Sequence, residues 1–134
     1  MKPRLLLVDD DPDTLALLEL AAKRSGFFSA VRVASDGQEA LNLLESDTVA
    51  PELIVSDLRM PRISGIELVK AIKRSPRIAD LPVAIITSSQ LPEDESAAKA
   101  AGACAFFVKG THAEMAEIFR AILARSRCAP VASA

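Results

Sequence analysis

Five short runs of apolar residues recur along the chain, without a clean alternation between apolar and polar positions. A strand that is covered on both faces reads as a nearly continuous apolar run, as in a parallel sheet packed between helices. These runs therefore predict five strands, at Arg4–Val8, Ala30–Ala34, Leu53–Ser56, Val83–Thr87 and Ala105–Val108.

Each apolar run is followed by a segment with the end signals of an α-helix. Asp11 before Pro12 is typical of a helix start, with Asp as the cap and Pro at the first helical position, and Gly26 is typical of a stop. Ser64 and Glu67 have the spacing of a capping box. The predicted helices cover Pro12–Ser25, open at Asp36 and at Ser64, run from near Pro92 to Gly102, and open at Thr111.

Strands that alternate with helices predict the fold class α/β, here a flavodoxin-like (βα)5 doubly wound parallel sheet. Five units favour the strand order 2-1-3-4-5, in which the first and third strands are neighbours. With 134 residues, half of them hydrophobic, the chain has the size of one domain with a substantial core. We expect this domain at 1–126 and a short flexible C-terminal tail at 127–134.

Charge and composition argue against several classes of protein. The net charge of −2 and the lack of basic clusters argue against nucleic-acid binding. No apolar run has the length of a membrane span, and the run before Asp9 is too short for a secretion signal. Cys104 lies in an apolar run and Cys128 in a polar tail, which favours two unpaired thiols, although a single disulfide stays open. We therefore expect a cytoplasmic protein.

Carboxylates follow two of the predicted strands: Asp9 and Asp10 follow the first, and Asp57 follows the third. In an open parallel sheet, ligands bind at the carboxyl ends of the strands. The predicted strand order brings these three side chains together, and crowded carboxylates favour a bound cation. An incomplete set of oxygen ligands suits Mg²⁺, which keeps several of its waters.

Two further polar side chains belong to the same edge of the predicted sheet, Thr87 at the end of the fourth strand and Lys109 after the fifth. A carboxylate can attack phosphorus and form an acyl phosphate. A metal ion and a lysine can neutralise charge on the phosphoryl oxygens, and a hydroxyl can donate a hydrogen bond to one of them. The joint placement of these residues predicts phosphoryl transfer.

With these residues, the chain resembles the receiver domain of bacterial two-component response regulators over residues 4–125. It looks like the single-domain type, such as the chemotaxis regulator that binds the flagellar motor. A weaker likeness, over Ile72–Pro82, is to the single-domain regulators paired with bacterial phytochromes. The stretches that carry the resemblance are Leu5–Asp13, Ser56–Gly65, Ile86–Ser89 and Gly102–Lys109.

The resemblance implies a signalling switch that assists only its own phosphorylation and dephosphorylation. Asp57 would accept a phosphoryl group from a histidine kinase or a histidine phosphotransfer protein in a Mg²⁺-dependent reaction. Asp10, Asp57 and the backbone carbonyl of Arg59 would bind Mg²⁺, with Asp9 acting mainly through water. Lys109 would pair with a phosphoryl oxygen.

The resemblance also implies a response to phosphorylation. Thr87 would move to hydrogen-bond another phosphoryl oxygen, and Phe106 would swing inward with it, while Phe107 is expected to be ordinary core. The surface of the fourth helix, fifth strand and fifth helix would then change its preference among protein partners, as a population shift between two states. The downstream target is unknown, and a homodimer through this surface stays open.

Three residues have a plainer interpretation or depart from the family. Asp11 is expected to cap a helix rather than bind metal, and His112 to be exposed rather than catalytic. Gly110 stands where the family usually has a proline after a cis peptide bond. Because the cis form costs about 2.5–4 kcal/mol before any other residue, we expect a trans bond and a looser loop at Gly110.

Rival functions remain beside the phosphorylated switch. A degenerate receiver acting as an unphosphorylated adaptor has Gly110 as its support. A phosphatase-type enzyme with an aspartyl nucleophile is disfavoured, because no glycine-rich phosphate loop is present. A DNA-binding regulator requires the chain to be a fragment of a longer protein.

Overall fold

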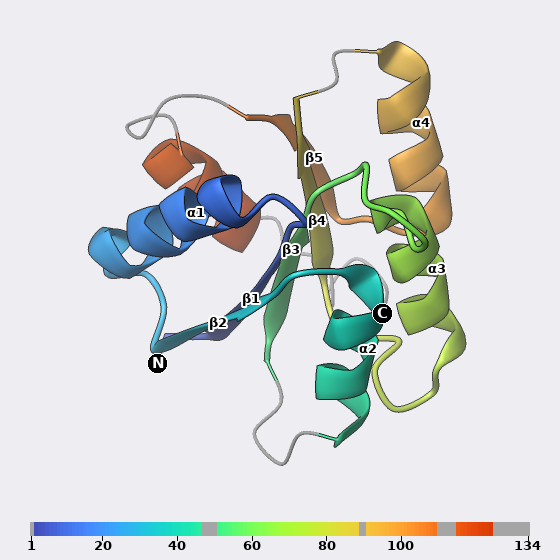
Figure 1. Cartoon of the computed structure of the whole chain (residues 1–134), viewed down its shortest axis with the longest axis horizontal. Coiled ribbons are helices and arrows are strands. Elements are labelled where there is room, and N and C mark those ends of the chain that lie inside the picture. Colours follow the sequence, from blue (N-terminus) through green and yellow to red (C-terminus); the bar gives the residue numbers. More distant parts are fainter. Residues whose placement is uncertain (1, 47–50, 89–90, 110–114, 125–134) are drawn as a thin grey trace.

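The computed structural model describes residues 2–46, 51–88, 91–109 and 115–124, and these form a parallel sheet with helices on both faces (Figure 1). The sheet has five strands in the order β2-β1-β3-β4-β5, and all of its neighbouring strands are parallel. The fold class and strand order predicted from the sequence are therefore confirmed. The strands are β1 (Arg4–Val8), β2 (Ala30–Ala34), β3 (Leu53–Ser56), β4 (Val83–Thr87) and β5 (Ala105–Val108).

The helices begin where the sequence signals predicted, to within one residue. Asp36 and Ser64 precede their helices as capping residues: an Asp36 carboxylate oxygen accepts a hydrogen bond from the backbone N–H of Glu39 at 2.7 Å, and Ser64 forms the predicted capping box with Glu67. The predicted start at Thr111 lies outside the described residues. The helices are α1 (Pro12–Ser25), α2 (Gly37–Ser46), α3 (Gly65–Arg74), α4 (Pro92–Ala101) and a helical segment over residues 115–124.

Two hydrophobic cores lie on opposite faces of the sheet, which explains the continuous apolar runs in β1, β3 and β4. Leu5 and Leu7 of β1 join the core under α1 and residues 115–124, whereas Leu6 and Val8 join the core under α2, α3 and α4. Figure 1 shows α1 on one side of the sheet and α2, α3 and α4 on the other. Side chains that alternate along one strand thus anchor both helical layers.

The register of the strands determines which loops meet at the carboxyl edge. Val8 of β1 pairs with Ser56 of β3, so the residues that follow these strands, Asp9 and Asp57, emerge side by side. The backbone continues this pairing for one step, since the N–H of Asp57 donates to the carbonyl of Val8 at 2.8 Å. Within the described part of the chain, no helix combines the length and apolar character needed to cross a bilayer.

Candidate phosphoryl-transfer site

Three carboxylates meet at the carboxyl ends of β1 and β3. Asp9, Asp10 and Asp57 each offer an oxygen atom, and these atoms all lie within 4.8 Å of one another. The three differ in exposure: Asp9 is buried, Asp57 is half-buried and Asp10 is exposed. The cluster expected from the strand order is therefore present, with one face open to solvent.

Lys109 joins two of these carboxylates. Its ammonium nitrogen lies 2.9 Å from Oδ2 of Asp9 and 3.1 Å from Oδ1 of Asp57. The lysine follows β5, and its backbone N–H donates to the carbonyl of Thr87 at 2.8 Å, which fixes the end of β5 against β4. Its side chain is only 23% exposed, so the ion pairs are partly shielded from water.

Asp9 has two partners that leave it little freedom. Besides the Lys109 contact at Oδ2, its Oδ1 accepts a hydrogen bond from the backbone N–H of Asp11 at 2.9 Å. Asp9 as a whole is 1% exposed. Asp10, at the open edge of the cluster, forms no ion pair among the described residues. The open oxygens of the cluster therefore belong mainly to Asp10 and Asp57.

The pKa values of Asp57 and Lys109 are both raised, for different reasons. Burial raises the pKa of Asp57, the charge of Asp9 raises it further, and Lys109 only partly opposes this. Burial alone would lower the pKa of Lys109, but the hydrogen bond from Lys109 to Asp9 and the charges of Asp57 and Asp9 outweigh it, so this pKa is raised. Asp57 therefore holds its proton more tightly mainly because it is partly buried and secondly because Asp9 lies beside it, whereas Lys109 does so because two carboxylates face it.

A divalent cation fits this set of donors. Among the described residues, three carboxylates face a single ammonium group, which gives this group of side chains a net negative charge. Mg²⁺ binds through one or two carboxylates while it keeps several waters. An exposed Asp10 and a half-buried Asp57 leave room for those waters. The chemistry of the donor set therefore matches Mg²⁺ better than a softer metal.

Asp11 lies beside the cluster but has another role. Its carboxylate accepts hydrogen bonds from the backbone N–H of Asp13 and from the hydroxyl of Thr14, at the start of α1. The hydrogen bond from Thr14 lowers the pKa of Asp11. The prediction that Asp11 caps a helix is confirmed.

Thr87 and the two phenylalanines of β5 lie where the sequence pattern expected them. Thr87 ends β4 and is 2% exposed. Phe106 packs against the core under α3 and α4, and Phe107 packs against the opposite core. Both rings are only partly buried, so burial does not single out Phe107 as the core residue. Gly110 and His112 lie outside the described residues.

The loop between β3 and α3 is tied down by contacts that the sequence did not reveal. Arg62 has a left-handed backbone, with φ of 67°, and its guanidinium lies 3.2 Å from Asp36 at the start of α2. On the other side, the guanidinium of Arg59 lies 2.9 Å from Asp94 in the first turn of α4. At the end of the loop, the N–H of Gly65 donates to the carbonyl of Leu58 at 2.7 Å.

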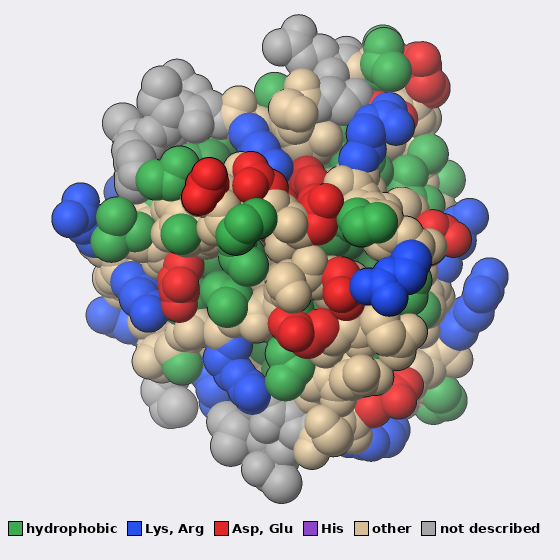
Figure 2. Space-filling view, viewed as in Figure 1, with side chains coloured by type: hydrophobic (Ala, Val, Ile, Leu, Met, Phe, Trp, Pro, Cys, Tyr) green, Lys and Arg blue, Asp and Glu red, His purple; other side chains and the backbone are tan. Residues whose placement is uncertain are grey.

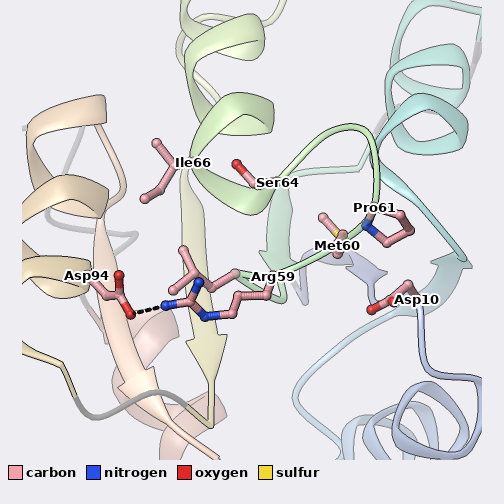
Figure 3. A pocket seen from close by; sticks show the side chains of 8 residues that line it. Asp10, Arg59, Met60, Pro61, Ser64, Ile66 and Asp94 are labelled. Atoms are coloured by element: carbon pink, nitrogen blue, oxygen red, sulfur yellow. Dashed lines mark hydrogen bonds and ion pairs between the residues drawn. The ribbon is translucent and has the colours of Figure 1, made fainter.

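A pocket of about 500 Å³ opens beside the carboxylate cluster (Figure 3). Figure 3 shows Asp10 on one side of it, Asp94 on the other, and the side chain of Arg59 between them, pointing toward Asp94. On the face seen in Figure 2, acidic side chains gather across the middle of the molecule. The pocket is lined by Asp10, Leu58, Arg59, Met60, Pro61, Ser64, Ile66 and Asp94.

Comparison with known protein families gives a match over nearly the whole chain. A sequence model described as the response regulator receiver domain matches residues 5–126. Among solved structures, the chemotaxis response regulator CheY4 of Vibrio cholerae superposes with a TM-score of 0.78 and 27% sequence identity, over 91% of this chain and 99% of that one.

Two curated relatives differ in length from each other. The chain is 40% identical over 98 residues to an uncharacterized 14.6 kDa protein of Leptolyngbya boryana, covering 73% of this chain and 72% of that protein. It is 38% identical over 107 residues to a gliding motility regulatory protein of Myxococcus xanthus, covering 80% of this chain but 13% of that protein. The chain thus spans a small part of one relative and most of the other.

Proposed function

The chain belongs to the response regulator receiver domain family, and we propose that it is a single-domain phosphorylation switch in which Asp57 accepts the phosphoryl group. The observation that carries this proposal is the contact of Lys109 with both Asp9 and Asp57, beside the open carboxylate of Asp10. The 14.6 kDa relative from Leptolyngbya supports the single-domain form. The domain would comprise residues 1–126, and the tail expected at 127–134 lies outside the described residues.

The reaction is an in-line substitution at phosphorus. A carboxylate oxygen of Asp57 attacks the phosphorus of a phosphohistidine on a histidine kinase or a histidine phosphotransfer protein. The P–N bond breaks, and its electron pair stays on the imidazole. The product is an acyl phosphate on Asp57.

The remaining site residues stabilise charge on the transferred group. Mg²⁺, held by Asp10, Asp57 and the backbone carbonyl of Arg59, with Asp9 acting through water, would neutralise part of the phosphoryl charge. The ammonium group of Lys109 lies 3.1 Å from Asp57 and can move onto a phosphoryl oxygen. The hydroxyl of Thr87 would donate a hydrogen bond to another.

The switch would act by changing protein contacts rather than by metabolic catalysis. A shift of Thr87 toward the phosphoryl group, with an inward rotation of Phe106, would alter the surface of α4, β5 and residues 115–124. Leu91 and Val108, which are 49% and 40% exposed, place apolar side chains near this surface. The partner that binds it, or a second copy of the chain, would be met in the cytoplasm.

The proposal is tested by intact-mass analysis after incubation with acetyl phosphate or phosphoramidate. The wild-type protein should gain one phosphoryl group in the presence of Mg²⁺ and none with excess chelator. Asp57→Ala should gain none. Asp80→Ala is the control: it removes an exposed carboxylate that does not belong to the cluster, and it should be labelled like the wild type.

A negative result needs one further measurement, because fast hydrolysis would also hide the label. Beryllofluoride mimics the phosphoryl group without being hydrolysed, and its binding can be followed by ¹⁹F NMR. A wild-type protein that neither gains mass nor binds beryllofluoride would contradict the proposal and favour the unphosphorylated adaptor.

A further inference from the structure

The two members of the ion pair between Arg59 and Asp94 differ in their exposure to solvent. The side chain of Arg59 is 67% exposed, whereas that of Asp94 is 17% exposed. Ion pairs with one side in solvent contribute about 0–1 kcal/mol to folding. The pair joins the loop after β3, which carries the proposed metal-binding carbonyl, to the first turn of α4.

Arg59 lies between two carboxylates that line one pocket. Asp94 holds its guanidinium at 2.9 Å, and Asp10 of the carboxylate cluster lies on the opposite wall (Figure 3). Asp10 has no ion-pair partner among the described residues, and the cluster as a whole has one ammonium group for three carboxylates. If Asp94 were removed, the carboxylates of the cluster, where a metal would bind, would attract the guanidinium of Arg59 toward Asp10.

We propose that Asp94 is a positioning residue: it holds the guanidinium of Arg59 away from Asp10, and so keeps the carboxylate cluster open to a divalent cation. A guanidinium cannot lose its proton at any physiological pH. If it is released toward the cluster, it competes with Mg²⁺ for Asp10 or repels it across the pocket. This inference rests on the proposed function, because it assumes that Mg²⁺ binds at the cluster.

The first turn of α4 provides a control for simple loss of charge. Glu93, Asp94 and Glu95 all lie in that turn. A negative side chain there is stabilised by the positive end of the helix dipole. Glu95 is already paired with Lys99 at 2.8 Å, so Glu93 is the better match. Glu93→Gln removes the same charge from the same turn without touching the contact between Arg59 and Asp94.

The test is a Mg²⁺ titration followed through the backbone amide signals of ¹⁵N-labelled protein, which requires no phosphorylation. Asp94→Asn should weaken Mg²⁺ binding about 3- to 10-fold, as expected when a free positive charge stays within roughly 10 Å of the ion. Asp94→Glu, which preserves the ion pair, should bind Mg²⁺ like the wild type. Glu93→Gln should change the affinity far less than Asp94→Asn.

The double variant Arg59→Met with Asp94→Asn separates positioning from loss of charge. If Asp94 acts through Arg59, removing the guanidinium should restore the affinity to the wild-type value or better. An equally weak affinity in the double variant, or a wild-type affinity in Asp94→Asn, would overturn the inference alone. A wild-type protein that binds no Mg²⁺ would overturn the metal site and the inference together.

Discussion

Lys109 reaches Asp57 across the end of an intervening strand. The two residues follow β5 and β3, and β4 lies between these strands in the sheet. The ammonium nitrogen nevertheless lies 3.1 Å from Oδ1 of Asp57 and 2.9 Å from Oδ2 of Asp9 on the next strand. One flexible side chain thus links the ends of three strands, and its length allows it to follow a carboxylate that becomes phosphorylated.

Lys109→Ala should separate the metal site from the response to phosphorylation. Losing the ammonium group removes hydrogen bonds to two carboxylates, and we expect a loss of about 1.5–3 kcal/mol of unfolding free energy without Mg²⁺. Mg²⁺ binding should be preserved or tightened, since a competing positive charge is gone. Urea unfolding with and without Mg²⁺ measures both effects.

A second measurement on this variant follows how the surface formed by α4, β5 and residues 115–124 responds to a mimic of the phosphoryl group. Addition of beryllofluoride should shift the amide signals of α4 in the wild type and shift them much less in Lys109→Ala. A variant that responds like the wild type would show that Lys109 has no part in the switch.

The five strands could be predicted to the residue, because their apolar runs are short, dense and bounded by polar residues. β3 and β4 are buried along their whole length, which is the condition under which a strand reads as a continuous run. The helix starts were equally readable, since caps such as Asp11 and Ser64 act through local hydrogen bonds. Local rules therefore explain most of the fold.

The carboxylate cluster could also be predicted, because the strand order alone brings Asp9 and Asp57 together. The contacts of Arg59 and Arg62 could not. They depend on the course of the loop between β3 and α3, including the left-handed backbone of Arg62, and this course follows from packing against two other helices. Sequence spacing carries no signal for an ion pair across 35 residues.

Gly65→Ala should damage the site through the backbone of Asp57. A Cβ atom at Gly65 would collide with the carbonyl oxygen of Asp57, and backbone cannot move aside as a flexible side chain can. We expect a loss of about 1–3 kcal/mol in unfolding free energy, the usual cost of overpacking, together with slower phosphorylation of Asp57. Thermal unfolding and intact-mass labelling measure the two effects.

Gly26→Ala is the matched control for this substitution. Gly26 ends α1 with φ of 73°, and a Cβ there meets no atom within 4 Å. It should cost about 1–2 kcal/mol through backbone strain alone, with the labelling rate unchanged. Equal labelling rates in the two variants would contradict the proposed link between Gly65 and Asp57.

Asp57→Asn should stabilise the protein at neutral pH in the absence of Mg²⁺. The folded-state pKa of Asp57 lies above its value in the unfolded chain, because of burial and the charge of Asp9. Stability linked to this carboxyl is therefore present below the unfolded pKa and is lost as the pH rises through the folded pKa. The amide avoids that loss, and we expect a gain of about 0.5–2 kcal/mol, as is common for stabilising substitutions at functional sites.

Two conditions should remove this gain. At acid pH, below both pKa values, the carboxyl is neutral in either state and the two proteins should have the same stability. Saturating Mg²⁺ should stabilise the wild type more than Asp57→Asn, because only the carboxylate is a strong ligand. Denaturant unfolding over a range of pH, with and without Mg²⁺, measures these differences. An amide variant that is less stable than the wild type at neutral pH would contradict the prediction.

The pKa of Asp57 should lie above that of an ordinary aspartate and the pKa of Asp11 below it, although both residues lie at the same edge of the sheet. Burial raises the pKa of Asp57, and the hydrogen bond from Thr14 lowers that of Asp11. The ¹³C signals of the two side-chain carboxyls should show this order in a pH titration.

Mg²⁺ should move the titration of Asp57 to lower pH and leave that of Asp11 nearly in place, because a cation bound at the cluster favours the ionised form of its own ligands. Thr14→Ala should raise the pKa of Asp11 alone; equal Mg²⁺ shifts for both carboxyls would mean that the ion is not held by Asp57.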